Sequence, residues 1–305
     1  MTLATPSRTA PARKSATGTA TAWLYYSPVL VSLVVWIYGP LVFTVVLSLL
    51  DWNLVSPDPQ FVGFDNYRTL IDQPEFGNAA WNTLLYALCV LPFATVVPAA
   101  LAIAMWKRPG RASNVYRVLL FLPVVLAPVA NAQAWQFVLD PLHGTLNSVL
   151  KAVGLPTHYW LGDPSTALVF VTIVTLSKVV ALNTLLFGAA LANVDRRTVE
   201  AAQMDDAREG EITRAVIVPQ LRRSMILLGL LSLVVVWPWL FTNISVLTRG
   251  GPSGATDNVY YRLYTYAFSF FEAGTASAAA IVIAVAFGLI VGVYALLSRR
   301  FRARR

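Results

Sequence analysis

The sequence predicts an all-α, polytopic membrane protein with six transmembrane helices and both termini in the cytoplasm. Hydrophobic residues make up 57% of the chain and charged residues only 12%, a balance that soluble domains do not have. Six apolar windows also reach the roughly 20 residues that a helix needs to cross a bilayer. These windows are continuous rather than alternating in polarity, which argues against a transmembrane β-barrel.

The six windows define a predicted membrane domain, residues 22–298. Residues 1–21 are rich in Ser, Thr, Ala and Pro and are predicted to be a disordered basic tail. The apolar run after them is too long for a cleaved signal peptide, so we expect it to remain as the first span. Residues 299–305 form a second basic tail. The predicted spans are Trp23–Leu50, Asn82–Met105, Val118–Phe137, Ala167–Leu191, Met225–Val246 and Ala276–Leu297.

The distribution of lysine and arginine predicts the orientation, because cytoplasmic loops are enriched in these residues. One side carries the basic tails and the stretches 107–117 and 196–223, which hold most of the positive charge. The other side carries only Arg68, Lys151, Arg249 and Arg262. Both termini and the loop 196–221 are therefore predicted to be cytoplasmic.

The sequence also argues against several classes of function. The single cysteine, Cys89, allows no intramolecular disulfide, and there is no Cys/His cluster for a metal. The arginines flank apolar segments, which is typical of topology signals rather than of nucleic-acid binding. The chain has no phosphate loop of the form GxxxxGK[ST], so we expect no ATP hydrolysis by it alone. An intramembrane enzyme or an ion-coupled secondary transporter would need motifs or buried acidic residues that are missing here.

The charged loop Glu200–Pro219, reading EAAQMDDAREGEITRAVIVP, is the most informative segment between the spans. Its pattern predicts an amphipathic helix over 197–209 that Gly210 interrupts. A second short helix, over 212–218, is expected to end at Pro219 because proline cannot donate into a continuing helix. Physical reasoning alone leaves two interpretations: an ordinary solvated loop, or a surface for a soluble partner.

Polar and aromatic residues within the spans are candidates for a solute pathway, because such residues usually face a bundle interior or an aqueous cavity. Each also has a structural interpretation. The lysine can pair with a helix carbonyl or with an acidic residue of a partner, and the others can hold helices together. The candidates are Lys178, Asn183, Trp237, Trp239 and Asn243.

The loop resembles the EAA loop of binding-protein-dependent ABC importer permeases, in which EAA, two residues and DGA are followed by a distal I-x-L-P. Further stretches resemble the carbohydrate-uptake branch of that family, of the maltose and glycerol-3-phosphate type. They are DWNL at 51–54, FVGFDNY at 61–67, Asn82–Thr83, FLP at 121–123, GTLN at 144–147, Trp160–Leu161, LTRGGP at 247–252 and YAF at 266–268.

The resemblance implies an ABC type I importer permease fold in a bacterial inner-membrane protein surrounded by lipid. It also implies three kinds of partner: a second permease subunit, a dimer of cytoplasmic ATPase subunits that bind ATP and Mg²⁺, and an extracytoplasmic solute-binding protein. No cofactor is expected on this chain. The implied solute is a sugar, an oligosaccharide, a polyol or glycerol 3-phosphate.

The resemblance also assigns the ATPase-coupling residues, with Glu200 making an ionic contact and Ala201 and Ala202 allowing close approach. The full set is Glu200, Ala201, Ala202, Asp205, Asp206, Ala207, Gly210 and Pro219. Asp206 stands where the family pattern has glycine. If that position needs a positive φ, we expect a strained turn or a turn shifted toward Gly210.

A tight-turn signal, Gly250–Gly251–Pro252, lies beside Arg249 on the opposite side of the membrane. It has two interpretations. The loop simply returns the chain toward the last span, or it contacts the binding protein together with residues 51–78.

Overall fold

The computed structural model describes residues 16–302, and the all-α prediction is confirmed for them apart from one short ladder. That ladder pairs β1 (Leu50–Asp51) with β2 (Gln60–Phe61) in antiparallel fashion, with Leu50 opposite Phe61. The chain divides into two compact units: residues up to Tyr67 together with Glu272 onward, and Arg68–Phe271. Of the predicted basic tails, residues 1–15 and 303–305 lie outside the described residues. Residues 16–21 belong to the first helix.

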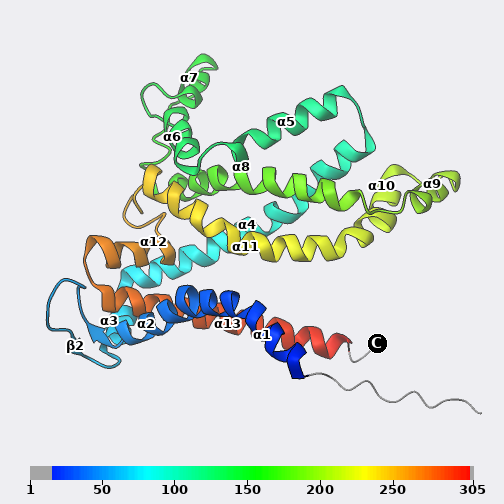
Figure 1. The fold of residues 1–305 in the computed structure, drawn as a ribbon. Helices are drawn as coiled ribbons and strands as arrows, with labels where there is room; N and C mark the ends of the chain where they lie inside the picture. The colour runs from blue at the N-terminus through cyan, green and yellow to red at the C-terminus, as the bar shows by residue number, and fades with distance from the viewer. Residues whose placement is uncertain (1–15, 303–305) are drawn as a thin grey trace, which may run out of the picture. The chain divides into compact units, whose positions relative to one another are not determined.

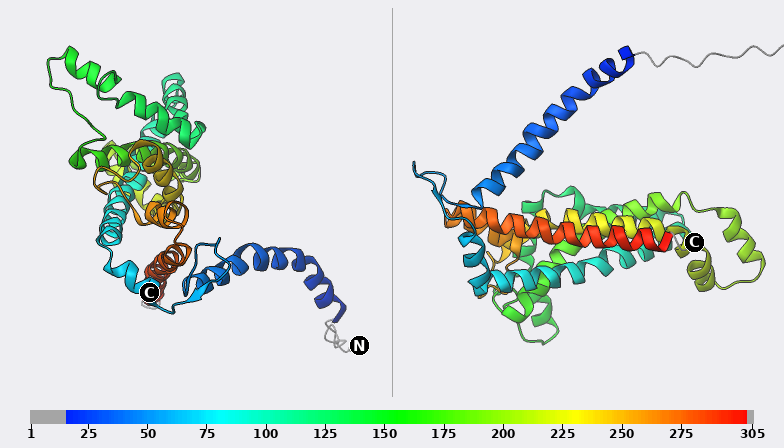
Figure 2. Two further views of the ribbon diagram at one scale, coloured as in Figure 1. Left: turned by 90° about the vertical axis from the view of Figure 1, so that its left-hand side faces the viewer. Right: turned by 90° about the horizontal axis from the view of Figure 1, so that it is seen from below.

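The first unit is built on two helical segments that meet beside the β ladder. α1 (Ala16–Leu33), the π-helical turn η1 (Val34–Tyr38) and α2 (Gly39–Leu47) form one segment, and α13 (Ala273–Arg302) forms the other. α2 packs against α13, and the two segments diverge toward their free ends (Figure 2). The Ala273 N–H donates to the Trp52 carbonyl over 3.2 Å, which fixes the start of α13. α3 (Asp65–Asp72) spans the sequence boundary between the units.

The second unit has a core of three long helices, α4 (Pro74–Lys107), α8 (Pro164–Leu191) and α11 (Val218–Leu247), which pack on one another (Figure 1). α9 and α10 lie at one end of this core, and α12 lies at the other. The shorter elements are α5 (Arg111–Val125), α6 (Pro128–Val138), α7 (Thr145–Ala152), α9 (Arg196–Met204), α10 (Glu209–Ile212), η2 (Thr213–Ile217), α12 (Val259–Tyr264) and η3 (Thr265–Ser269).

Four helices among the described residues are long and apolar enough to cross a membrane: Trp23–Leu47, Pro74–Lys107, Pro164–Leu191 and Glu209–Leu247. A fifth candidate is the pair α5 and α6, which are bent by 105° at the break between them. α13 extends from Ala273 to Arg302, and the predicted window Ala276–Leu297 lies within it. The six predicted windows therefore correspond to helical segments, and the third of them is broken between α5 and α6.

The prediction of one continuous helix over Val118–Phe137 is wrong. Leu126 and Ala127 are extended, with ψ of 137° and 141°, and separate α5 from α6. The reason is Pro128, because a proline ring disfavours the helical conformation of the residue before it. Pro128 itself is acceptable in the first turn of α6, where no intrahelical N–H bond is needed.

The prediction that Pro219 ends a helix is also wrong. A π turn, Thr213–Ile217, comes directly before it, and the chain then continues into α11. The Val218 N–H bonds back to the Thr213 carbonyl, so the wider turn makes room for a ring that would clash with the carbonyl four residues earlier. The same arrangement precedes Pro40, where the Gly39 N–H bonds to the Val34 carbonyl.

Gly274 provides a test of the packing at the start of α13. A Cβ added there would run into the Leu50 carbonyl and the side-chain amide of Asn66. That amide is already fixed, because Asn66 donates to the carbonyls of Ser48 and Leu50 over 3.0 and 2.9 Å. We expect Gly274→Ala to destabilise the protein by about 1–3 kcal/mol, as overpacked sites do, measured as a lower Tm in detergent.

Gly288→Ala is the matched control, because nothing lies within 4 Å of a Cβ at that position of the same helix. There alanine should leave Tm unchanged or raise it slightly, since it favours helix over glycine. Equal Tm values for both variants would contradict the packing at Gly274.

Candidate functional site

The loop between α8 and α11 folds into two short helices whose first helix is fixed at its start. The Asp195 side chain caps α9 by accepting from the Arg197 N–H over 2.9 Å. Gln220, from α11, accepts from the Asp195 N–H over 3.2 Å and donates to the Thr198 hydroxyl over 3.3 Å. These contacts hold the first turn of α9 beside the start of α11.

The end of α9 is a Schellman motif, in which a residue of positive φ closes a helix and its orphan carbonyls are capped by later N–H groups. Asp206 holds the positive-φ position, with φ of 57°. Its N–H bonds to the Gln203 carbonyl, and the Ala207 N–H bonds to the Ala202 carbonyl, each over 3.2 Å. Ala202 and Ala207 both pack against the same hydrophobic cluster.

The structure therefore corrects the predicted helix limits in this loop. The first helix ends at Met204 rather than at 209, because the turn at Asp205–Ala207 closes it. Gly210 does not interrupt a helix but lies inside α10. The turn has not shifted toward Gly210. Aspartate itself adopts the positive φ expected of the family glycine.

The two short helices bury one apolar face and expose the rest. Val199 and Ile212 are buried in a cluster that includes Phe187 and Leu191 of α8 and Ile103 of α4. Ala202 and Ala207 are partly buried. The other residues that the sequence predicts to contact an ATPase are on the surface: Glu200, Ala201, Asp205, Asp206, Gly210 and Pro219.

Glu200 opens onto a cleft of about 270 Å³ at the end of the core. Within the part of the chain that the structure describes, its carboxylate has no ion-pair partner. The residues that line the cleft include two that are positively charged, Lys107 and Arg196, and two that are negatively charged, Glu200 and Glu209. Met204, on the same helix, is 87% exposed. This surface is suited to a partner that brings a cation and an apolar contact.

Lys178, predicted either to bind solute or to pair with protein, has protein partners. It is only 2% exposed, and its ammonium donates to the carbonyls of Pro123 and Leu126 over 2.7 and 2.6 Å. The same ammonium lies 5.7 Å from the centre of the Trp239 ring. Pro123 lies in the last turn of α5 and Leu126 directly follows that helix, where the span breaks, so Lys178 caps the broken helix end.

Asn183 satisfies a carbonyl that a proline leaves unpaired. Pro98 has no N–H for the Ala94 carbonyl four residues earlier in α4. The buried Asn183 side chain of α8 donates to that carbonyl and to the Ser232 hydroxyl of α11, each over 2.6 Å. One amide thus joins the three core helices.

The remaining pathway candidates lie in α11. Asn243 is buried and donates to the Thr175 hydroxyl of α8 over 2.8 Å. Trp237 and Trp239 pack on buried clusters, each only partly covered. Solute contact by any of the five candidates stays a prediction, while each has a defined packing or hydrogen-bond role.

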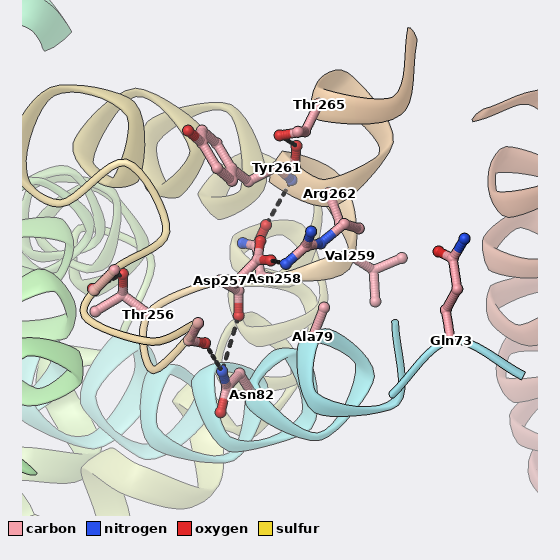
Figure 3. Close-up of polar contacts among 12 residues, drawn as sticks. Gln73, Ala79, Asn82, Thr256, Asp257, Asn258, Val259, Tyr261, Arg262 and Thr265 are labelled. Atoms are coloured by element: carbon pink, nitrogen blue, oxygen red, sulfur yellow. Dashed lines mark hydrogen bonds and ion pairs between the residues drawn. The ribbon is translucent and has the colours of Figure 1, made fainter. Parts of the chain in front are cut away.

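The loop of residues 249–258 is tightly fixed to the first part of α4 (Figure 3). Asn82 reaches the carbonyls of Gly254, Ala255 and Asp257 over 3.0–3.2 Å, and the Tyr86 hydroxyl donates to the Thr256 carbonyl. Burial raises the pKa of Asp257, although its ion pair with Arg262 acts in the opposite direction. The tight-turn signal was visible in the sequence, whereas these anchors were not.

Long apolar helices joined by buried polar side chains define an α-helical integral membrane protein, and the comparisons with known proteins define its family. The model of the "Binding-protein-dependent transport system inner membrane component" family matches residues 95–303. The chain therefore belongs to this family.

Curated relatives extend the similarity beyond the matched region. The probable ABC transporter permease protein YurN of Bacillus subtilis is 32% identical over 86% of this chain and 90% of its own length. The diacetylchitobiose uptake system permease protein NgcF of Streptomyces coelicolor is 32% identical over 77% and 69%. The sn-glycerol-3-phosphate transport system permease protein UgpA of Pectobacterium atrosepticum is 28% identical over 89% and 91%.

Two solved structures share the fold. One is of a bacterial ABC transporter involved in the import of the acidic polysaccharide alginate, with a TM-score of 0.81 at 22% identity over 93% of this chain and 98% of that chain. The other is of a bacterial alginate ABC transporter in complex with an alginate pentasaccharide-bound periplasmic protein, with a TM-score of 0.83 at 22% identity over 93% and 97%.

The positive φ of Asp206 in the Schellman turn predicts the effect of replacing this residue with glycine. Glycine adopts positive φ without the steric cost that a side chain has there, so Asp206→Gly should stabilise the end of α9 by about 0.5–1 kcal/mol. Slower amide hydrogen exchange in α9 would report this. Asp205→Gly is the control, because Asp205 has a φ of −83°. Glycine there should speed exchange, and equal effects of both variants would contradict the turn.

The hydrogen bonds of Lys178 to two carbonyls predict that this residue stabilises the protein. Lys178→Met should leave two buried carbonyls without donors and lower stability by about 2 kcal/mol or more, the scale of hydrogen bonds to charged groups, measured as Tm in detergent. Ser177→Ala removes only a bond within the same helix, from Ser177 to the Val174 carbonyl, and should have little effect. An unchanged Tm for Lys178→Met with altered solute preference would instead favour the solute-contact interpretation.

Proposed function

We propose that the chain is the permease subunit of an ATP-driven importer of carbohydrates or sugar-like solutes. The observation that carries the proposal is the structure of the loop that resembles an EAA loop. It forms an exposed helix that ends in a Schellman turn and packs on the core helices, and the chain belongs to the binding-protein-dependent transport family. The chain itself has no phosphate loop. ATP and Mg²⁺ would be bound by two partner ATPase subunits, with a second permease completing the membrane part.

The solute class is supported by the relatives. Their names refer to diacetylchitobiose and sn-glycerol 3-phosphate, and both solved structures are of alginate transporters. A sugar, oligosaccharide, polyol or sugar phosphate would arrive from a separate solute-binding protein on the outer face. Trp237 and Trp239 of α11, which are only partly covered, are compatible with such a solute.

The proposed orientation places α9 and α10 in the cytoplasm, with six membrane crossings and both termini on the same side, in a bacterial inner membrane. The lysine and arginine distribution supports it. In this arrangement, the surface of α9 that carries Glu200 and Met204 docks on the ATPase. Glu200 would meet a cation of that subunit, and its unpaired, exposed carboxylate supports this role.

The proposal predicts that Glu200 couples ATP hydrolysis to uptake. Glu200→Gln should weaken the coupling, and Glu200→Arg should abolish uptake while membrane insertion and protein level remain normal, because the charge change opposes an ionic contact. The measurement is solute uptake in cells whose growth depends on this importer, with protein level checked in isolated membranes.

Glu211→Gln is the matched control in the same loop. It removes an equal charge from an exposed residue and leaves an oxygen to accept from the Arg208 N–H, a bond of 2.9 Å. Uptake should stay close to that of the unmodified protein. Normal uptake by a well-expressed Glu200→Arg variant would refute the assignment.

A further inference from the structure

The coupling segment, defined here as residues 196–213, is held by the last turn of α4. The ammonium of Lys107 donates to the Thr213 hydroxyl over 2.7 Å and to the Glu209 carbonyl over 3.0 Å. Its distance to the Glu209 carboxylate is 3.7 Å. Lys107 therefore fixes the α10 end of the segment to the end of a membrane-spanning helix.

The other end of the segment contacts Trp106, the residue before Lys107 in α4. The Arg196 guanidinium, at the start of α9, lies 5.7 Å from the centre of the Trp106 ring. Such a contact between a cation and an aromatic ring is attractive but weak at an exposed site. Two consecutive residues of α4 thus hold both ends of the segment that carries Glu200.

The hydrogen bonds of Lys107 outweigh its ion pair. The Lys107 side chain is only 21% exposed, whereas that of Glu209 is 81% exposed. A carboxylate so accessible to water contributes little as an ion-pair partner. The carbonyl and the hydroxyl are therefore the contacts that fix the lysine, and removing the charge of Glu209 should matter less than removing the hydroxyl of Thr213.

Apolar contacts also join the coupling segment to α4. Val199 of α9 and Ile212 of α10 share their buried cluster with Ala99, Ala102 and Ile103 of α4. The Schellman turn between them closes the segment into a compact body. Both polar and apolar contacts therefore join α9 and α10 to the end of α4.

We propose that Lys107 is a positioning residue that joins the coupling segment to α4, so that the ATPase moves this span when it moves α9. Trp106 supports the same joint through Arg196. This inference rests on the proposed function and adds the span that receives the motion and the side chain that transmits it.

The only cysteine of the chain, Cys89, lies exposed in α4 and provides the probe. A nitroxide spin label on Cys89, in the assembled importer with cysteine-free partner subunits, reports the surroundings of α4. Its spectrum is recorded without nucleotide and with the ATPase trapped by ATP and vanadate. We expect the spectrum to change on trapping in the unmodified protein, and the Lys107→Met variant to lose most of that change.

Four further variants test whether the hydrogen bonds of Lys107 carry the effect. Lys107→Arg keeps donors for both oxygens and should retain the spectral change. Thr213→Val should reproduce part of the loss, and the double variant with Lys107→Met should be no worse than Lys107→Met alone, because the two residues act in one contact. Glu209→Gln should retain the change.

Arg108→Met is the matched control, because it removes one positive charge from the next residue, which is exposed. It should respond as the unmodified protein does. An unmodified protein with no spectral change on trapping, or a Lys107→Met variant with the full change, would overturn the inference. Failure of the proposed function is distinguishable, because the chain would then not co-purify with an ATPase and Glu200→Arg would leave uptake normal.

Discussion

The membrane-spanning core depends on satisfying backbone carbonyls that prolines and breaks leave unpaired, because lipid offers no water to do so. Lys178 supplies donors to the carbonyls of Pro123 and Leu126 at the break in the α5–α6 pair, and Asn183 supplies one to the Ala94 carbonyl below Pro98. Both donors come from α8, the helix that packs on α4, α5 and α11. A buried cation at a helix end also complements the negative end of the helix dipole. The irregular spans are therefore held together by the side chains of one central helix.

The coupling segment shows how a short sequence pattern follows from helix geometry. The Schellman turn brings Ala202 and Ala207 together on the hydrophobic cluster. Small side chains there let α9 lie close to the core, while Glu200 and Met204 remain on the outer surface. The pattern EAA with a later DDA thus specifies a helix, its closing turn and the face that is buried. Asp206 fits because aspartate tolerates positive φ better than most residues.

The sequence predicted the helical class, the apolar segments and the position of the charged loop between α8 and α11, because hydrophobic length and charge distribution are local properties of the chain. It did not predict the break at Leu126–Ala127, since apolar windows hide the effect of Pro128 on the preceding residue. It also missed the partners of Lys178 and Asn183 and the anchoring role of Lys107. Nothing local distinguishes Lys107 from Arg108, and the difference arises only when the chain brings Glu209 and Thr213 beside the end of α4.

α4 has polar attachments at both of its ends. Asn82 and Tyr86 hold the loop of residues 249–258, and Lys107 holds the coupling segment. The helical rise of about 1.5 Å per residue places these two sets of contacts roughly 37 Å apart, which is the scale of a whole membrane crossing. Pro98 lies between these two sets of contacts and would weaken an isolated helix. In the protein, the Asn183 amide donates to the Ala94 carbonyl that this proline leaves without a partner. The buried polar contacts of the core therefore also support α4 at Pro98, between its two sets of polar contacts.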